Sequence, residues 1–108
     1  MDTSGQEHPK GIIEVEIDRD LEELIPSYLA NRRRDIRDAH EAIEKMDFET
    51  VARLGHTMKG SGGGYGFDFI SALGANLEQS GKDHALDDIK KQVAELTDYL
   101  DRLRIIYR

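Results

Sequence analysis

The sequence contains no cysteine and no tryptophan, and only two of its 108 residues are proline. The absence of cysteine excludes disulfide bonds, thiolate chemistry and metal sites that depend on cysteine ligands. Aromatic residues make up only 6% of the chain, so we expect a core of aliphatic side chains. Acidic residues outnumber basic ones and give a formal net charge of −7. This charge argues against a sequence-independent grip on the phosphates of a nucleic acid.

Long apolar stretches are also missing from the chain. No segment approaches the length needed to cross a membrane, and the polar start has no apolar signal-peptide core. We therefore expect a soluble, cytoplasmic protein without a membrane contact. The length suits a single domain with a modest core. The histidines other than His56 lack the spacing of metal ligands, so we predict no metal or cofactor bound by this chain.

The start of the chain differs in pattern from the rest. Residues 1–18 are predicted to be a flexible or extended lead-in, and residues 19–108 a helical domain. Within the lead-in, residues 12–17 alternate apolar and acidic side chains, and this period of two favours a short extended segment. No second strand is evident in the sequence. We therefore expect the segment to lie along the domain or to stay mobile.

From Leu21 onwards, apolar residues recur every three or four positions, which is the period of an amphipathic helix. Residues typical of caps and turns divide this pattern into helices. Pro26 either kinks the first helix or lies in the first turn of a longer one that ends near Met46. Asp47 is a candidate N-cap of the next helix, and Gly66 suits a helix end or a turn.

The second half of the chain continues the helical pattern. Gly81 is predicted to cap the end of one helix and Asp83 the start of the next. The last helix is predicted from Leu86 to Tyr107, because its apolar residues keep the spacing throughout. The sum is an all-α fold, an antiparallel four-helix bundle with a short extended or disordered N-terminal segment. We expect such a bundle to be a monomer.

One histidine lies beside a cluster of five glycines between Gly60 and Gly66. Each glycine inside a helix costs about 1 kcal/mol relative to alanine, so the cluster needs a reason. At about 100° per residue, His56 lies roughly 200° from Leu54 and faces away from the predicted core. Gly60 and Gly63 fall within about 40° of the direction of His56. The missing side chains would leave the ring open to a large partner.

Two basic residues flank the histidine, Lys59 about 60° to one side and Arg53 about 60° to the other. The local field is therefore positive although the chain is acidic. A neutral imidazole nitrogen is a nucleophile at physiological pH, and basic side chains stabilise a bound phosphoryl group. The pattern predicts a phosphoryl carrier. The helix of His56 offers no acid–base partner at a fixed spacing, so we expect the catalytic electrostatics to come from the protein that brings the phosphoryl group.

These residues resemble the histidine phosphotransfer (HPt) domain of two-component phosphorelays. The family signature is a histidine, a lysine three positions on, a glycine four on, a small hydroxyl residue next, and a glycine ten on. The resemblance covers the helical part of the chain. The matching positions, which continue into the following helix, are His56, Lys59, Gly60, Ser61, Gly66, Leu73, Leu77 and Glu78.

The resemblance implies a phosphocarrier rather than an enzyme. His56 would accept a phosphoryl group from the aspartyl phosphate of a receiver domain, or from a hybrid sensor histidine kinase, and pass it to another receiver. Lys59 would orient or neutralise that group. The chain would bind no cofactor itself, and the Mg²⁺ would lie in the partner receiver domain. The predicted partner-binding residues are Gly60, Gly63, Arg53 and Ser61.

Other readings remain open at this point. A non-phosphorylated adaptor or inhibitor could dock a receiver or kinase through the same face, and His56 would then be dispensable. A module excised from a larger hybrid kinase is a third possibility, although the initial methionine and polar lead-in favour a complete small protein. The basic run from Arg32 to Arg37 is expected to be a solvated helix face rather than a docking surface. The partner proteins, the output pathway and the direction of net phosphoryl flow stay open.

Overall fold

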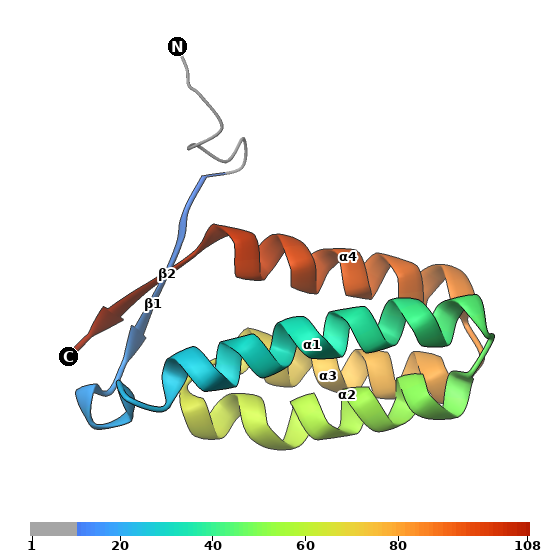
Figure 1. Ribbon diagram of the computed structural model, residues 1–108, viewed down its shortest axis with the longest axis horizontal. Helices are drawn as coiled ribbons and strands as arrows, with labels where there is room; N and C mark the ends of the chain where they lie inside the picture. Colours follow the sequence, from blue (N-terminus) through green and yellow to red (C-terminus); the bar gives the residue numbers. More distant parts are fainter. Residues whose placement is uncertain (1–10) are drawn as a thin grey trace, which may run out of the picture.

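The computed structural model describes residues 11–108, in which four helices form an antiparallel bundle (Figure 1). The helices are α1 (Ile25–Glu44), α2 (Phe48–Gly62), α3 (Asp68–Lys82) and α4 (Leu86–Arg102). Two short 3₁₀ turns, η2 (Arg19–Leu21) and η3 (Gly63–Tyr65), precede α1 and follow α2. The predicted four-helix bundle is confirmed. Residues 1–10, which belong to the predicted lead-in, lie outside the described residues.

The core of the bundle is mainly aliphatic, as the composition predicts. Every helix contributes buried side chains, and so do strand β1 (Ile13–Ile17) and the α2–α3 turn. The largest of the most deeply buried side chains are Phe67, Ile17, Ile25, Met58, Ile70, Leu77 and Ile89. None of the helices within residues 11–108 is both long and apolar enough to cross a membrane.

The start of α1 and the next two helix connections follow the predicted signals. Pro26 lies in the first turn of α1, where the missing N–H is not needed for the helix. The carboxylate of Asp47 caps α2 by accepting a hydrogen bond from the backbone N–H of Thr50 at 3.1 Å. Gly66 ends η3 with a φ of 91°, which favours glycine. A Cβ at this position would also lie 2.7 Å from Cδ1 of Ile17, so the turn packs directly on the strand.

The α3–α4 connection differs from the prediction. Gly81 does not cap α3 but lies inside the helix, and the positive φ of the turn, 55°, falls on His84. Asp83 does not cap α4, whose N-cap position is Ala85. Gly81 is small for a packing reason, because an added Cβ would lie 2.7 Å from the backbone nitrogen of Ala52 in α2. At Gly81, glycine therefore serves the packing of α3 on α2 and not the capping of a helix.

The two ends of the domain also differ from the prediction. Helix α4 ends at Arg102 instead of continuing to Tyr107, and strand β2 (Leu103–Tyr107) follows it. This strand pairs in parallel with β1 (Ile13–Ile17), so the extended segment near the start of the chain has a partner after all. The two strands are far apart in the sequence, with all four helices between them. In space they lie side by side at one end of the bundle (Figure 1). Such a non-local pair leaves no signal in a local pattern, although the β-branched and aromatic residues of β2 suit a strand.

Candidate functional site

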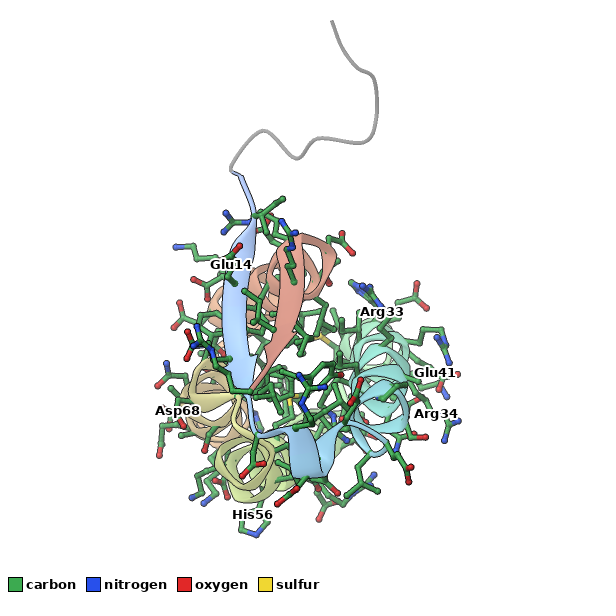
Figure 2. All side chains as sticks on the ribbon, turned by 90° about the vertical axis from the view of Figure 1, so that its left-hand side faces the viewer. Glu14, Arg33, Arg34, Glu41, His56 and Asp68 are labelled. Atoms are coloured by element: carbon green, nitrogen blue, oxygen red, sulfur yellow. The ribbon has the colours of Figure 1, made fainter. Side chains whose placement is uncertain are left out.

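The His56 side chain lies on the outer surface of α2, with 69% of its area exposed. Figure 2 shows the ring projecting away from the bundle. On the opposite face of the same helix, Leu54 and Met58 are buried in the core. This orientation is the one that the helical period predicts, because two residues rotate by about 200°. The ring is therefore open to a partner.

A carboxylate from the neighbouring helix holds the His56 ring. Oε2 of Glu78, in α3, lies 3.1 Å from Nδ1 of His56. An ionised carboxylate only accepts hydrogen bonds, so the ring donates from its Nδ1–H. In a neutral imidazole the other nitrogen then carries the lone pair. The contact with Glu78 therefore makes Nε2 the hydrogen-bond acceptor of the neutral ring.

The same carboxylate binds two lysines. Nζ of Lys59 lies 3.0 Å from Oε1 of Glu78, and Nζ of Lys82 lies 3.5 Å from Oε2. These contacts, led by the hydrogen bond from Lys59, lower the pKa of Glu78 to about 2, although partial burial acts in the opposite direction. Glu78 is therefore ionised at physiological pH, as a fixed negative charge inside a basic cluster. Residues 11–108 contain no group of three or more ligating side chains placed to hold a metal ion.

Glycines bring α2 and α3 close enough for Glu78 to reach His56. A Cβ added at Gly55 would lie 2.4 Å from the backbone nitrogen of Glu78. A Cβ added at Gly74 would lie 2.5 Å from the backbone nitrogen of Lys59. Both distances are far shorter than van der Waals contact, so the two backbones pack directly against each other at these positions. We call this contact the glycine seam.

Sequence reasoning found no acid–base partner on the helix of His56, and the structure supplies Glu78 from the neighbouring helix α3. Glu78 belongs to the positions that carry the family resemblance, but its role beside His56 does not follow from them because it comes from another helix. Its distance from His56 depends on how α2 and α3 are aligned, which the period of each helix alone does not give. Gly55 and Gly74 are the signal that could have shown the alignment, since each lies on the inner face of its helix.

The glycines beyond His56 have a different environment. A Cβ at Gly60 would meet nothing within 4 Å, and one at Gly63 would only reach Oδ1 of Asp68, at 4.0 Å. No packing within the described chain therefore requires glycine at Gly60. Both positions are exposed and follow the histidine by about one and two turns.

Two other residues predicted for the site make their side-chain contacts with residues other than His56. Arg53 is exposed on α2, and its guanidinium reaches back one turn along the helix. The hydroxyl of Ser61 lies 3.1 Å from the hydroxyl of Tyr28 and accepts a hydrogen bond from Arg32 at 3.2 Å. Tyr28 and Arg32 belong to α1. The structure therefore places Ser61 in the α1–α2 contact and not in the cluster around His56.

Arg32 corrects the prediction of a fully solvated basic run. Its side chain is buried, with its guanidinium 4.5 Å above the ring of Tyr28 and 2.8 Å from the carboxylate of Asp35. Burial raises the pKa of Asp35 above its ordinary value, against the opposing effect of the guanidinium. The other three arginines of the run are exposed. A buried charge held by a neighbouring carboxylate joins α1 to α2 here.

Comparisons with known proteins bear on the whole domain. A family model described as the Hpt domain matches residues 20–105, a range that extends from η2 into β2 and includes the His56 cluster. Neither the comparison with curated proteins nor the comparison with solved structures gave a match. The family match covers most of the chain and agrees with the four-helix bundle. The chain therefore belongs to the Hpt domain family, which functions in the phosphotransfer of two-component relays.

Proposed function

We propose that this protein carries a phosphoryl group on Nε2 of His56 between the receiver domains of a two-component phosphorelay. The observation that carries the proposal is the contact between His56 and Glu78. It holds an exposed ring by Nδ1 and leaves the lone pair of the neutral ring on Nε2. Membership of the Hpt domain family supports the same chemistry.

In the proposed step, the lone pair on Nε2 attacks the phosphorus of an aspartyl phosphate in the receiver. The bond from phosphorus to the aspartyl oxygen breaks, and that oxygen leaves with the electron pair as a carboxylate. The ring becomes a phosphorylated imidazolium that keeps its proton on Nδ1, and Glu78 stabilises the new positive charge. No proton has to move, so the step reverses when the carrier meets a second receiver. The receiver domain of a hybrid sensor histidine kinase would donate in the same way.

The surroundings of the ring have matching roles in this proposal. Lys59 is half-exposed and held 3.0 Å from Glu78, so its flexible side chain can turn from that carboxylate towards the phosphoryl oxygens. Gly60 leaves the approach of the receiver clear, with Gly63 and Arg53 at the edge of the same surface. The Mg²⁺ of the reaction is proposed to lie in the receiver. This chain then acts as a phosphotransfer intermediate and not as an enzyme.

Transfer from a panel of phosphorylated receiver domains tests the proposal. The wild-type protein should acquire an acid-labile, base-stable label, and His56→Gln should acquire none while keeping its thermal stability, because the side chain is exposed. His40→Gln is the matched control, since it removes an exposed histidine of α1 and should leave labelling unchanged. A label on His56→Gln would contradict the choice of histidine. Receiver binding without any label on the wild type would favour an adaptor instead.

A further inference from the structure

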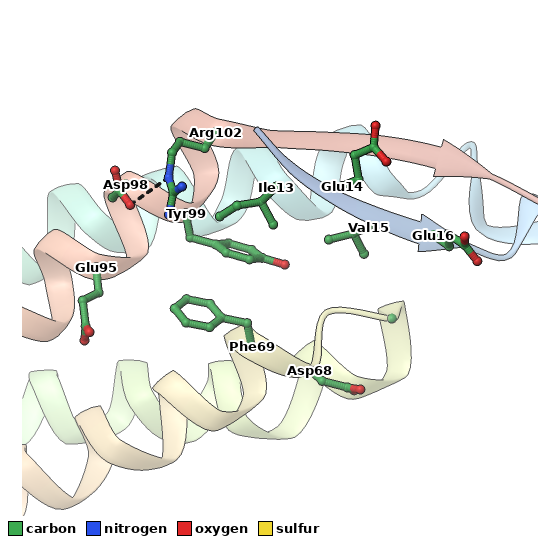
Figure 3. A pocket seen from close by; sticks show the side chains of 11 residues that line it. Ile13, Glu14, Val15, Glu16, Asp68, Phe69, Glu95, Asp98, Tyr99 and Arg102 are labelled. Atoms are coloured by element: carbon green, nitrogen blue, oxygen red, sulfur yellow. Dashed lines mark hydrogen bonds and ion pairs between the residues drawn. The ribbon is translucent and has the colours of Figure 1, made fainter. Parts of the chain in front are cut away.

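A groove of about 700 Å³ lies between β1, the start of α3 and the end of α4 (Figure 3). Its floor is aromatic, with the rings of Phe69 and Tyr99 stacked 4.4 Å apart. Phe69 is 41% exposed and is one of the four exposed large apolar side chains of residues 11–108. Figure 2 shows Glu14 and Asp68, which line the groove, well separated from the ring of His56. The groove is therefore a feature distinct from the phosphotransfer site.

One edge of β1 borders this groove without a partner strand. The backbone carbonyl of Ile17 accepts a hydrogen bond from the N–H of Arg108, on the side of β2. Because backbone groups alternate in direction along a strand, those of Glu14 and Glu16 point to the other edge. Within residues 11–108 the sheet has only the strands β1 and β2. The edge thus presents backbone donors and acceptors that another strand can use.

The lining of the groove is acidic. Its carboxylates belong to Glu14, Glu16, Asp68, Glu95 and Asp98. Arg102 is the basic residue of the lining, and it binds Asp98 at 3.0 Å. The two glutamates of β1 are offset by Arg104 of β2, 3.9 Å from Glu14, and by Arg108, which follows β2 and lies 2.6 Å from Glu16. Asp68 and Glu95 form no ion pair within the described part of the chain, so the groove favours a basic partner.

The pleat of β1 sets the side-chain pattern of such a partner. Along each strand, successive side chains point to opposite faces of the sheet. The side chains of an added strand would therefore lie alternately on the inner and the outer face. On the inner face, a new strand beside β1 would place its side chains next to Ile13 and Val15, above Phe69, where apolar groups fit. On the outer face they would lie next to Glu14 and Glu16, where basic groups fit. The matching segment therefore alternates apolar and basic residues.

We propose that the groove binds an extended, alternately apolar and basic segment of a partner protein, which adds to β1 as a third strand. Addition of a strand to an exposed edge is a general mode of peptide binding, in which the backbone supplies affinity and the side chains supply specificity. The segment would tether its protein to this chain while His56 stays open to a receiver. The proposal is independent of the chemistry at His56.

A blocked heptapeptide of alternating lysine and valine is the probe. It is titrated into the full-length, ¹⁵N-labelled protein, and the amide shifts are followed by NMR. The shifts should be confined to the groove, with the largest at Glu14, Glu16 and Phe69. The amides of Glu14 and Glu16 should also exchange more slowly with solvent, because each gains a hydrogen bond. The same peptide with glutamate in place of lysine should not bind.

Three variants locate the interaction. Glu95→Lys should weaken peptide binding roughly two- to fivefold, as expected for one exposed charge pair. Glu44→Lys makes the same charge change on an exposed part of α1, outside the groove, and should leave binding unchanged. Glu16→Pro removes an N–H from the free edge without removing a bond to β2, and should weaken binding as well. The NMR spectrum of each variant first shows that the fold is intact.

Shifts confined to the groove, and weakened by Glu95→Lys but not by Glu44→Lys, would support the proposal. Three results would overturn it: shifts spread over the acidic surface and equal in the two lysine variants, no shifts at all, or groove shifts that follow the concentration of the protein without peptide. The last result would make a second copy of the chain the occupant. Transfer through His56 is measured separately, so each proposal can fail alone.

Discussion

Two faces of α2 contain glycine for opposite reasons. On the face towards α3, Gly55 is buried, and an added Cβ would lie 2.4 Å from a backbone atom of the neighbouring helix. On the solvent side, a Cβ at Gly60 would meet nothing within 4 Å. The buried glycine is needed for the fold, whereas the exposed one weakens the helix without an internal gain. The residue type alone does not tell these cases apart.

The comparison explains how a solvated histidine can have a fixed orientation. His56 lies between the two faces, with most of its side chain in water. Its orientation comes from Glu78, which the glycine seam brings within 3.1 Å. Access comes from the open face, where Gly60 carries no side chain. Rigid positioning and free approach thus depend on different glycines, and substitutions at each should have opposite effects on stability.

Gly74→Ala should have the largest effect. The new Cβ would lie 2.5 Å from the backbone nitrogen of Lys59, so α2 and α3 must move apart. We expect a loss of about 1–3 kcal/mol in the free energy of unfolding, despite the better helix propensity of alanine. Phosphoryl transfer should slow as well, because Glu78 moves away from His56. Urea unfolding and a transfer assay measure the two effects.

Gly64→Ala is the matched control for the seam. A Cβ at Gly64 would meet nothing within 4 Å, and its φ lies outside the left-handed region. The same substitution should therefore be neutral or stabilising there. If Gly74→Ala were as stable as Gly64→Ala, the seam would not be a close backbone contact, and the account of how Glu78 is positioned would fail.

Ser61→Ala should have the next largest effect. The hydroxyl accepts a hydrogen bond from buried Arg32 and contacts the hydroxyl of Tyr28, so its loss removes one hydrogen-bond partner from each of these groups. We expect unfolding to become easier by about 1–3 kcal/mol, with transfer unchanged in the folded protein. Thr57→Ala removes an exposed hydroxyl from the same helix and should stay within about 0.5 kcal/mol. Slower transfer at unchanged stability would instead place Ser61 on the partner surface.

The parts of the fold that sequence reasoning predicted are those with local causes. The helical period placed Leu54 inside and His56 outside, because both positions follow from rotation about one axis. Asp47 and Gly66 were predicted as a cap and a turn, because a short carboxylate and a positive φ act within a few residues. The family resemblance then gave His56 its chemistry, since the spacing of the motif lies within one helix.

The parts that sequence reasoning missed depend on contacts between distant segments. Strand β2 was predicted as helix because its apolar spacing fits both periods, and its pairing with β1 decides between them. Arg32 was expected in solvent because its contact with Ser61 forms only when α1 packs against α2. Glu78 was missed for the same reason. In each case the deciding interaction is tertiary, which a local pattern does not contain.

Gly60→Ala should have a smaller effect on stability, and of opposite sign. Alanine is the better helix former and meets no neighbour here, so the free energy of unfolding should rise by about 0.5–1 kcal/mol. Transfer from a receiver should nevertheless slow, because a methyl group now projects into the approach to His56. Gly64→Ala should be similarly stable and transfer at the wild-type rate. Equal transfer rates in the two variants would remove access as the reason for Gly60.

Glu78→Gln should have an effect on stability that depends on pH. The contacts with Lys59 and His56 lower the pKa of Glu78 from its ordinary value of 4.5 to about 2 in the folded protein. A lowered pKa means that the ionised group stabilises the fold above about pH 4.5, and that this contribution is lost as the pH falls towards 2.

Thermal unfolding between these pH values should therefore show a flatter profile for Glu78→Gln than for the wild type. Glu44→Gln removes an exposed carboxylate of α1 and should keep the wild-type slope. Parallel profiles for the wild type and Glu78→Gln would mean that the lysines do not hold this carboxylate in solution. Glu78 would then not be held beside Nδ1 of His56, and the reason for assigning the lone pair to Nε2 would be lost.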